Sequence, residues 1–268
     1  LTGRIPEELG KLTALQGLVL HKNQLSGNIP PELGDLRQLQ RLWLSNNHLT
    51  GTIPKELGKL TALTELYLQR NNLSGAIPKE LGALGKLEQL SLLSNKLTGT
   101  IPLELGNLEA LVYLGLQRNE LSGESLGTSL GALSELKQLW LSSNKLTGHI
   151  PPQLGDLGAL KLLYLYDNKL DGTIPAQLSA LNKLTWLDLS NNQLSGTIPK
   201  ELGKLIALEE LYLFGNNLSG RIPPELGNLA ALTVLDLHGN KLSGHIPEEL
   251  GSLTELNGLD LSYNTLSG

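Results

Sequence analysis

A phrase of 24 residues recurs along the chain, and it constrains the fold more than any other feature. Its fixed letters are Leu-x-Gly-x-Ile-Pro-x-x-Leu-Gly-x-Leu-x-x-Leu-x-x-Leu-x-Leu-x-x-Asn-x, and eleven copies span almost all of the 268 residues. A strict period of this length predicts a solenoid, in which each unit buries its apolar face against its neighbours. We expect function at the letters that vary. The copies start at Leu1, Leu25, Leu49, Leu73, Leu97, Leu121, Leu146, Leu170, Leu194, Leu218 and Leu242.

The array predicts one continuous domain over residues 1–268, because stacked repeats share a single elongated core. The sixth copy, residues 121–145, departs from the phrase through one extra residue and the loss of Ile-Pro. We expect an irregular outer loop near Ser125 to Ser129, with the strand at Leu136 to Leu141 still in register. A tolerated loop insertion is favoured over a functional break.

Composition excludes several classes of partner. The formal charge of −5 is mild, and no run of basic residues suggests binding to nucleic acid. No apolar stretch is long enough to span a bilayer, and the first residue already belongs to a repeat, so we expect no signal peptide. The chain lacks methionine, which indicates a processed or excised part of a longer protein.

The chain also lacks cysteine, so it holds no disulfide and no thiolate metal site. This absence fits a reducing compartment, yet a fragment trimmed of disulfide-bearing ends would look the same. The compartment is therefore left open between intracellular and extracellular. No motif predicts a cofactor, since the glycines punctuate the repeat and form no phosphate-binding loop.

The Leu-x-x-Leu-x-Leu segment of each copy alternates apolar and variable residues, which is typical of a strand with one buried face. In the second copy Leu42 and Leu44 are expected to point inward, whereas Arg41 and Trp43 point outward. Strands one repeat apart run in the same direction, so the copies predict a long parallel sheet. The asparagine that ends each segment is expected to form a buried column whose amides bond the backbone of the next turn.

The other half of each copy predicts a tight turn followed by a short helical segment. Gly3 and its equivalents permit the turn, and Pro6 can open the helical segment. Eight copies place glutamate two residues after the proline, where a carboxylate favours the helix dipole. This acidic stripe is interpreted as a solvated convex face.

These motifs resemble the plant-specific class of leucine-rich repeat, known from the ectodomains of receptor-like kinases and from polygalacturonase-inhibiting proteins. The resemblance covers the whole chain and is specific in ten of the eleven copies. It implies an α/β repeat solenoid, a curved superhelix with an inner parallel sheet, with partner binding on the inner surface and no catalysis by the repeats. Secreted members usually carry cysteine-paired caps, which this sequence lacks, and similar repeats occur in intracellular ROCO-type GTPases.

Ten aromatic side chains are the most informative variable letters. All lie in or at the end of the alternating segments, on outward positions, while the predicted interior is leucine and isoleucine. Large aromatics on an open sheet face are typical of protein-binding hot spots. We therefore predict as ligand-binding Trp43, Tyr67, Tyr113, Trp140, Tyr164, Tyr166, Trp186, Tyr212 and Phe214, with Tyr263 one position beyond the alternation.

The densest group spans the sixth to ninth copies and is expected to form one anchor patch, because adjacent strands place these side chains near one another. The alternative is that aromatics simply suit the surface of a strand. The predicted patch consists of Trp140, Tyr164, Tyr166, Trp186, Tyr212 and Phe214.

Charge on the same face is graded, from a net excess of two positive charges in the first five copies to a net excess of four negative charges later. A polarised face would orient an extended partner, although drift over exposed sites would give the same pattern. Arg41, Arg70 and Arg118 join the predicted binding set. The charged positions are Lys22, Arg41, Arg70, Arg118, Glu65 and Glu88 in the first half, and Asp167, Asp188, Glu209, Glu210, Asp236, Asp260, Lys137 and Lys161 in the second.

Catalysis is disfavoured. The best constellation is Asp236, His238 and Asp260 on neighbouring strands, which could bind a metal or share a proton. Such a site would lie on an open sheet that does not exclude water, so we predict neither an enzyme nor a metal site. An ice-binding face is also disfavoured, since the letter between Gly and Ile is too mixed to form a uniform ladder.

The sequence thus predicts a recognition module that binds a protein or peptide on its concave aromatic face, as the sensing segment of a larger receptor or signalling protein. A secreted enzyme inhibitor and an architectural or oligomerising scaffold remain open. Asn72 and Asn217 begin glycosylation sequons, which the repeat itself generates easily. Both ends lack a polar cap, which predicts fraying or self-association there.

Overall fold

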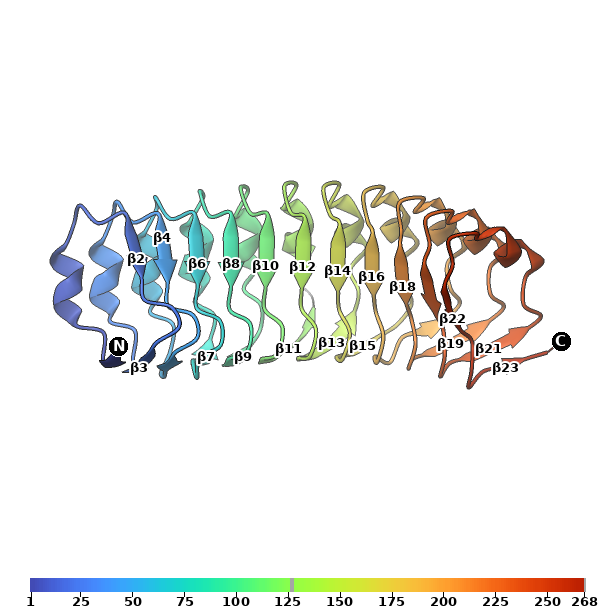
Figure 1. Cartoon of the computed structure of the whole chain (residues 1–268), viewed down its shortest axis with the longest axis horizontal. Helices are drawn as coiled ribbons and strands as arrows, with labels where there is room; N and C mark the ends of the chain where they lie inside the picture. Colours follow the sequence, from blue (N-terminus) through green and yellow to red (C-terminus); the bar gives the residue numbers. More distant parts are fainter. Residues whose placement is uncertain (126–127, 268) are drawn as a thin grey trace. The chain divides into compact units, whose positions relative to one another are not determined.

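The computed structural model describes residues 1–125 and 128–267. They fall into two compact units, Leu1–Gly123 and Glu124–Gly268. In each unit, short strands line up side by side and 3-10 helices lie behind them (Figure 1). The repeat solenoid expected from the sequence is confirmed within each unit. The assignment of residues 1–268 to a single domain stays a prediction.

The alternating segments form the principal parallel sheet, one strand per repeat. Each residue pairs with its counterpart one repeat later, as Leu163 does with Leu187. The constant repeat length keeps this register, because every insertion-free copy returns the chain to the same point. The first unit contains β2 (Gly17–Val19), β4 (Arg41–Trp43), β6 (Glu65–Tyr67), β8 (Gln89–Ser91) and β10 (Tyr113–Gly115). The second contains β12 (Gln138–Trp140), β14 (Leu162–Tyr164), β16 (Trp186–Asp188), β18 (Glu210–Tyr212), β20 (Val234–Asp236) and β22 (Gly258–Asp260).

A second set of parallel strands follows the asparagine of each repeat, and sequence analysis missed it. The polar letters around Leu-Ser-Gly hide the strand character of this segment. In the first unit the set comprises β1 (Thr2–Gly3), β3 (Gln24–Gly27), β5 (His48–Leu49), β7 (Ser74–Ala76) and β9 (Lys96–Gly99), and β11 (Glu120–Ser125) begins there. In the second unit it comprises β13 (Lys145–His149), β15 (Lys169–Asp171), β17 (Ser195–Gly196), β19 (Asn217–Gly220), β21 (Lys241–Gly244) and β23 (Thr265–Leu266).

Each Ile-Pro is followed by one 3-10 helix, as the proline predicted, with Pro6 and its equivalents at the N-cap. Glutamates occupy the first turn in most copies, where the dipole favours them. The helices are η1 (Glu7–Lys11), η2 (Pro31–Asp35), η3 (Lys55–Lys59), η4 (Lys79–Ala83), η5 (Leu103–Asn107), η6 (Thr128–Ala132), η7 (Pro152–Asp156), η8 (Ala176–Ala180), η9 (Lys200–Lys204), η10 (Pro224–Asn228) and η11 (Glu248–Ser252). No helix in residues 1–125 and 128–267 is long and apolar enough to cross a membrane.

The core between strands and helices is almost entirely leucine and isoleucine. Leu42 and Leu44 are fully buried, as the alternation predicted. The asparagine column is also confirmed: Asn192 accepts from the Leu170 N–H (3.0 Å) and donates to the carbonyls of Leu165 and Leu189. The amides were predicted to bond the backbone of the next turn. This direction was wrong, because the Asn192 amide donates to Leu165 in the preceding repeat.

Two local expectations concern the sixth copy. The strand there is β12, which pairs in register with β14, so the predicted register is confirmed. The irregular loop predicted near Ser125 to Ser129 includes residues 126–127, which lie outside the described residues. The 3-10 helix η6 resumes the pattern at Thr128.

Candidate functional site

The open face of the principal sheet presents three rows of side chains that point away from the leucine core. They come from the residue before the central leucine of each strand, the residue after it, and the residue two further on. We call these the first, central and third rows. In the second unit the central row consists of Trp140, Tyr164, Asp188, Tyr212, Asp236 and Asp260, in strand order from β12 to β22.

Aromatic rings on β12 to β18 and just after these strands form a continuous chain of contacts, which we call the aromatic ladder. Tyr164 lies 4.6 Å from Trp140 and 5.7 Å from Trp186, centroid to centroid. Trp186 in turn lies 5.7 Å from Tyr212. Tilted and edge-on contacts at such distances are the preferred aromatic geometries. The ladder members are Trp140, Tyr164, Tyr166, Trp186, Tyr212 and Phe214, and all six are half-buried.

The predicted proximity of these six rings is therefore confirmed, and their role in binding stays a prediction. The proximity follows from parallel pairing, because residues one repeat apart lie on adjacent strands and face the same side. Trp186 completes the chain from the first row, between Tyr164 and Tyr212 of the central row. Its indole Nε1–H is buried and has no acceptor among the described residues.

Asp188 lies within this ladder, in register between Tyr164 and Tyr212. Its Oδ1 accepts hydrogen bonds from the Ser190 N–H (3.0 Å) and from the Ser190 hydroxyl (2.6 Å). Burial raises the pKa of Asp188 against these two bonds, and the charges of Asp167 and Asp236 raise it further. The carboxylate is thus held in a half-buried, negatively charged environment.

Glu210 supplies a second carboxylate beside the ladder. It accepts a hydrogen bond from the hydroxyl of Tyr212. Burial raises the pKa of Tyr164 to about 12, and the charges of Glu210 and Asp188 add to the effect. The pKa of Tyr212 is raised as well, chiefly by burial and by its bond to Glu210. Both phenols therefore remain neutral hydrogen-bond donors at physiological pH.

The constellation of Asp236, His238 and Asp260 noted in the sequence comes together, with Asp236 on β20, His238 just after it and Asp260 on β22. The Nδ1 atom of His238 lies 2.7 Å from Asp236 Oδ1 and 3.7 Å from Asp260 Oδ2. The ligand atoms of the three residues all lie within 4.8 Å of one another. Each carboxylate also accepts the backbone N–H two residues later, which is a structural task. Phe214 stacks on the imidazole at 4.6 Å, so His238 extends the ladder.

The open face of the first unit carries a shorter aromatic group. His21 stacks on Trp43 (5.7 Å), and Trp43 lies 5.6 Å from Tyr67. The indole of Trp43 donates to Glu65 Oε2 at 2.9 Å. Beyond Tyr67 the central row of the first unit continues with Ser91 and Gly115, which carry no ring.

Tyr113, another predicted binding residue, does not project from the sheet. Its ring lies over Gly115, where a Cβ would collide with the phenol. Burial raises its pKa, opposed by hydrogen bonds with Ser91 and Gln117. The sequence signal for this arrangement is the glycine itself, which leaves room for a ring two residues away on the same side of the strand.

The predicted cations of the first unit divide into two structural groups. Arg41 lies on β4, in register with Glu65 on β6. Arg70 and Arg118 follow their strands with φ of 54° and 56°, and Lys22 has φ of 52°. All four lie at the strand ends or on the open face, and the three arginines are exposed. Sequence analysis missed this left-handed position, although Gly215 and Gly239 occupy it in later repeats.

The remaining charged positions of the predicted gradient do not lie on the strands. Lys137, Lys161, Glu88 and Glu209 precede them and are exposed, and Asp167 follows β14 at φ of 52°. Fewer charged residues of the predicted gradient therefore lie on the strands of the open face. They are Arg41 and Glu65 in the first unit and four carboxylates in the second. Those four are Asp188, Glu210, Asp236 and Asp260.

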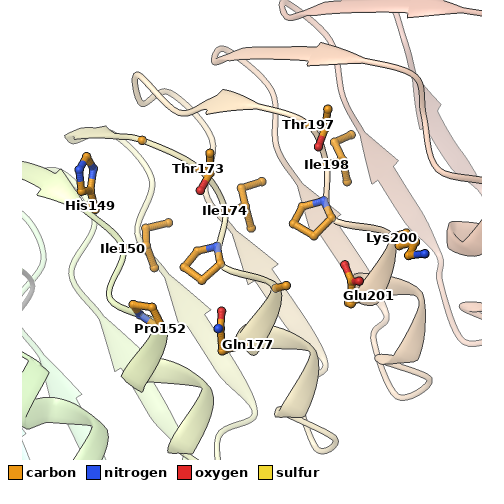
Figure 2. A pocket seen from close by; sticks show the side chains of 14 residues that line it. His149, Ile150, Pro152, Thr173, Ile174, Gln177, Thr197, Ile198, Lys200 and Glu201 are labelled. Atoms are coloured by element: carbon orange, nitrogen blue, oxygen red, sulfur yellow. The ribbon is translucent and has the colours of Figure 1, made fainter.

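A groove lies away from this face, at the Ile-Pro segments of the second unit (Figure 2). It has a volume of about 890 Å³ and is open to solvent. Ile150, Ile174 and Ile198 and the neighbouring prolines line it, from three successive repeats. Smaller grooves lined by the equivalent residues occur at the Ile-Pro segments of the first unit. The groove is therefore a product of the repeat and carries no distinct chemistry.

Comparisons with known proteins agree with this architecture. The family described as "Leucine-rich repeat region" matches residues 2–101 and 100–267. The Arabidopsis receptor kinase HAESA, in complex with the peptide hormone IDA and the co-receptor SERK1, is 40% identical with a TM-score of 0.96, over 100% of this chain and 44% of that chain. The plant peptide hormone receptor RGFR1 in complex with RGF2 is 37% identical with a TM-score of 0.87, over 100% and 46%.

A plant ice-binding protein is also similar, at 34% identity and a TM-score of 0.73, over 85% of this chain and 73% of that one. The chain spans less than half the length of the two receptors. Among curated proteins, none matches it by sequence.

Proposed function

The chain belongs to the leucine-rich repeat family, and on that premise we propose that it is a non-catalytic recognition module of a larger receptor. It binds a peptide across the open face of its second unit. The aromatic ladder is the observation that carries this proposal, because six half-buried rings in mutual contact form a rigid, partly desolvated surface. Membership of the family also confirms the resemblance drawn from the motifs.

Two further observations support a peptide. HAESA and RGFR1, both similar along the whole of this chain, were solved with peptide hormones bound. The open face of the second unit also spans the adjacent strands β12 to β22, so an extended segment can follow one row from strand to strand. Nothing on this face excludes water from a reacting bond, so catalysis and bound cofactors have no part in the proposal. The mild acidity gives no footprint for nucleic acid.

The test is selection from a displayed library of random linear peptides, followed by affinity measurements on variants. Trp140→Ala and Tyr164→Ala are each expected to weaken a selected peptide by about 30-fold or more, because each removes a ring from a packed hot spot. Ile206→Ala is the matched control, since Ile206 is 67% exposed and lies between η9 and β18, outside the ladder.

Unchanged affinity in both aromatic variants would overturn the proposal, as would an equal loss in the Ile206 control. Thermal unfolding of every variant separates loss of the surface from loss of the fold. The ladder rings are half-buried and lie outside the leucine core, so the variants are expected to unfold as cooperatively as the parent chain.

A further inference from the structure

From β14 to β20 the central row of the second unit alternates rings with carboxylates. Tyr164, Asp188 and Tyr212 lie on adjacent strands in direct register. Trp186 lies on the same strand as Asp188, and its ring contacts both tyrosines at 5.7 Å. Three aromatic rings therefore border a single half-buried carboxylate.

One oxygen of that carboxylate is available. Oδ1 of Asp188 accepts both bonds from Ser190, whereas Oδ2 accepts none from a described residue. Neither Asp188 nor Glu210 forms an ion pair with a described lysine or arginine side chain. Asp167 and Asp236 lie close enough to raise the pKa of Asp188, so this carboxylate, which has no lysine or arginine partner among the described residues, lies among like charges.

The geometry selects among ligands by charge and by shape. An anionic group would be repelled by Asp188, Glu210 and Asp236. A cation gains twice, from the carboxylate and from the negative faces of the rings. A guanidinium suits this site better than an ammonium, because it is planar, stacks on aromatic faces, loses hydration more readily and carries several N–H donors.

We propose that Asp188, Tyr164, Trp186 and Tyr212 form a subsite for the guanidinium group of an arginine side chain in a bound peptide. The guanidinium stacks on the ladder and donates to Asp188 Oδ2. The inference rests on the proposed function, since it names the kind of peptide side chain that the ladder receives. It adds a requirement for positive charge that a purely apolar ladder would not have.

The first test uses N-acetyl-arginine amide as the probe and N-acetyl-citrulline amide as its neutral isostere. Tryptophan indole N–H signals in NMR spectra report the position, because the chain has three tryptophans and two of them lie in the ladder. The arginine probe is expected to shift the Trp186 signal in a saturable manner and to leave Trp43 unshifted. The citrulline probe is expected to shift neither.

The second test removes the charge with Asp188→Asn, which keeps the Oδ1 acceptor for Ser190. Asp260→Asn is the matched control. It removes the same charge from the same row and preserves an equivalent bond to the Ser262 N–H, and Asp260 is not flanked by ladder rings. Asp188→Asn is expected to weaken an arginine-containing selected peptide by at least about 10-fold, and Asp260→Asn by less than about 3-fold.

The outcomes separate this inference from the proposed function. Selected peptides that bind the ladder equally well with arginine or citrulline would overturn the subsite and leave peptide binding intact. An arginine probe that shifts Trp186 while no library peptide binds would overturn peptide binding and leave the cation site intact. A shift of Trp186 by spermidine and not by the arginine probe would overturn the assignment to a peptide side chain. Equal losses in the two variants would assign the effect to overall charge.

Discussion

In the first unit the central row of the open face carries Trp43 and Tyr67 and then gives way to Ser91 and Gly115. In the second unit every residue of the same row is an aromatic ring or a carboxylate. The charged side chains differ in the same way, with exposed arginines around the first face and four carboxylates on the second. The two faces therefore present different side-chain chemistry on one kind of backbone.

The scaffold beneath the two faces does not differ. In the first unit Asn71 accepts from the Leu49 N–H at 3.0 Å and donates to the carbonyls of Leu44 and Leu68, both at 3.0 Å. Asn192 makes the corresponding three bonds in the second unit. The residues of the open face are therefore expected to vary at a much smaller cost in stability than the asparagines and leucines of the scaffold.

The largest expected effect tests whether the asparagine column supports both units equally. Asn71→Ala and Asn192→Ala each leave one buried N–H and two buried carbonyls without the asparagine amide, and the cost is about 3–5 kcal/mol of unfolding free energy in either unit. Chemical denaturation measures it. If one variant loses far more unfolding free energy than the other, the scaffold differs between the units and the comparison of the two faces on one scaffold fails. Ser26→Ala is a mild control, since its exposed hydroxyl makes only a 3.4 Å bond to the Gly3 carbonyl.

Much of the fold and of the ladder could be predicted, because a strict repeat period determines where each residue lies in the solenoid. Twenty-four residues per turn of the solenoid and apolar alternation together fix which letters point outward, so the ladder from Trp140 to Phe214 followed from the sequence alone. Parallel register did the rest, by placing counterpart residues on adjacent strands.

The features that could not be predicted depend on side-chain contacts that residue identity alone does not specify. Tyr113 was expected to project, yet it lies over Gly115 because the missing side chain leaves space. The division of labour between the two oxygens of Asp188 depends on the Ser190 hydroxyl, which could equally have faced solvent. The left-handed residue before each asparagine had a signal in Gly215 and Gly239, which was masked by the arginines and serines of other copies.

A smaller effect concerns the pH dependence of the carboxylates, which only the second face has in its central row. The raised pKa of Asp188 means that the folded state binds its proton more tightly than the unfolded state. Its ionisation therefore costs stability as pH rises through the folded pKa, and the cost is absent below the ordinary aspartate pKa near 4. The pKa of Asp260 is lowered by its bonds from Ser262, so its ionised form adds stability that is lost as pH falls through the lowered pKa.

The two asparagine variants should accordingly change stability in opposite directions at pH 7. Asp188→Asn is expected to raise the thermal midpoint by a few degrees, an advantage that disappears near pH 3. Asp260→Asn is expected to lower it slightly. A fall in the midpoint of Asp188→Asn at pH 7 would show that Asp188 supports the fold, and the proposed cation subsite would lose its basis in an uncompensated charge.

The smallest expected change in stability concerns Arg70, which occupies a backbone position that suits glycine. Arg70 has φ of 54°, whereas Gly239 has φ of 62° at the equivalent place. A non-glycine residue in this region costs about 1 kcal/mol, so Arg70→Gly is expected to raise the unfolding free energy by about 0.5–1 kcal/mol. Gly239→Ala is the reciprocal control and should lower it by a similar amount, because a Cβ there would meet nothing closer than 3.5 Å. Loss of stability in Arg70→Gly would mean that the guanidinium supports the scaffold. A gain would mean that the left-handed backbone at Arg70 is strained and that the chain keeps this cation at a cost in stability.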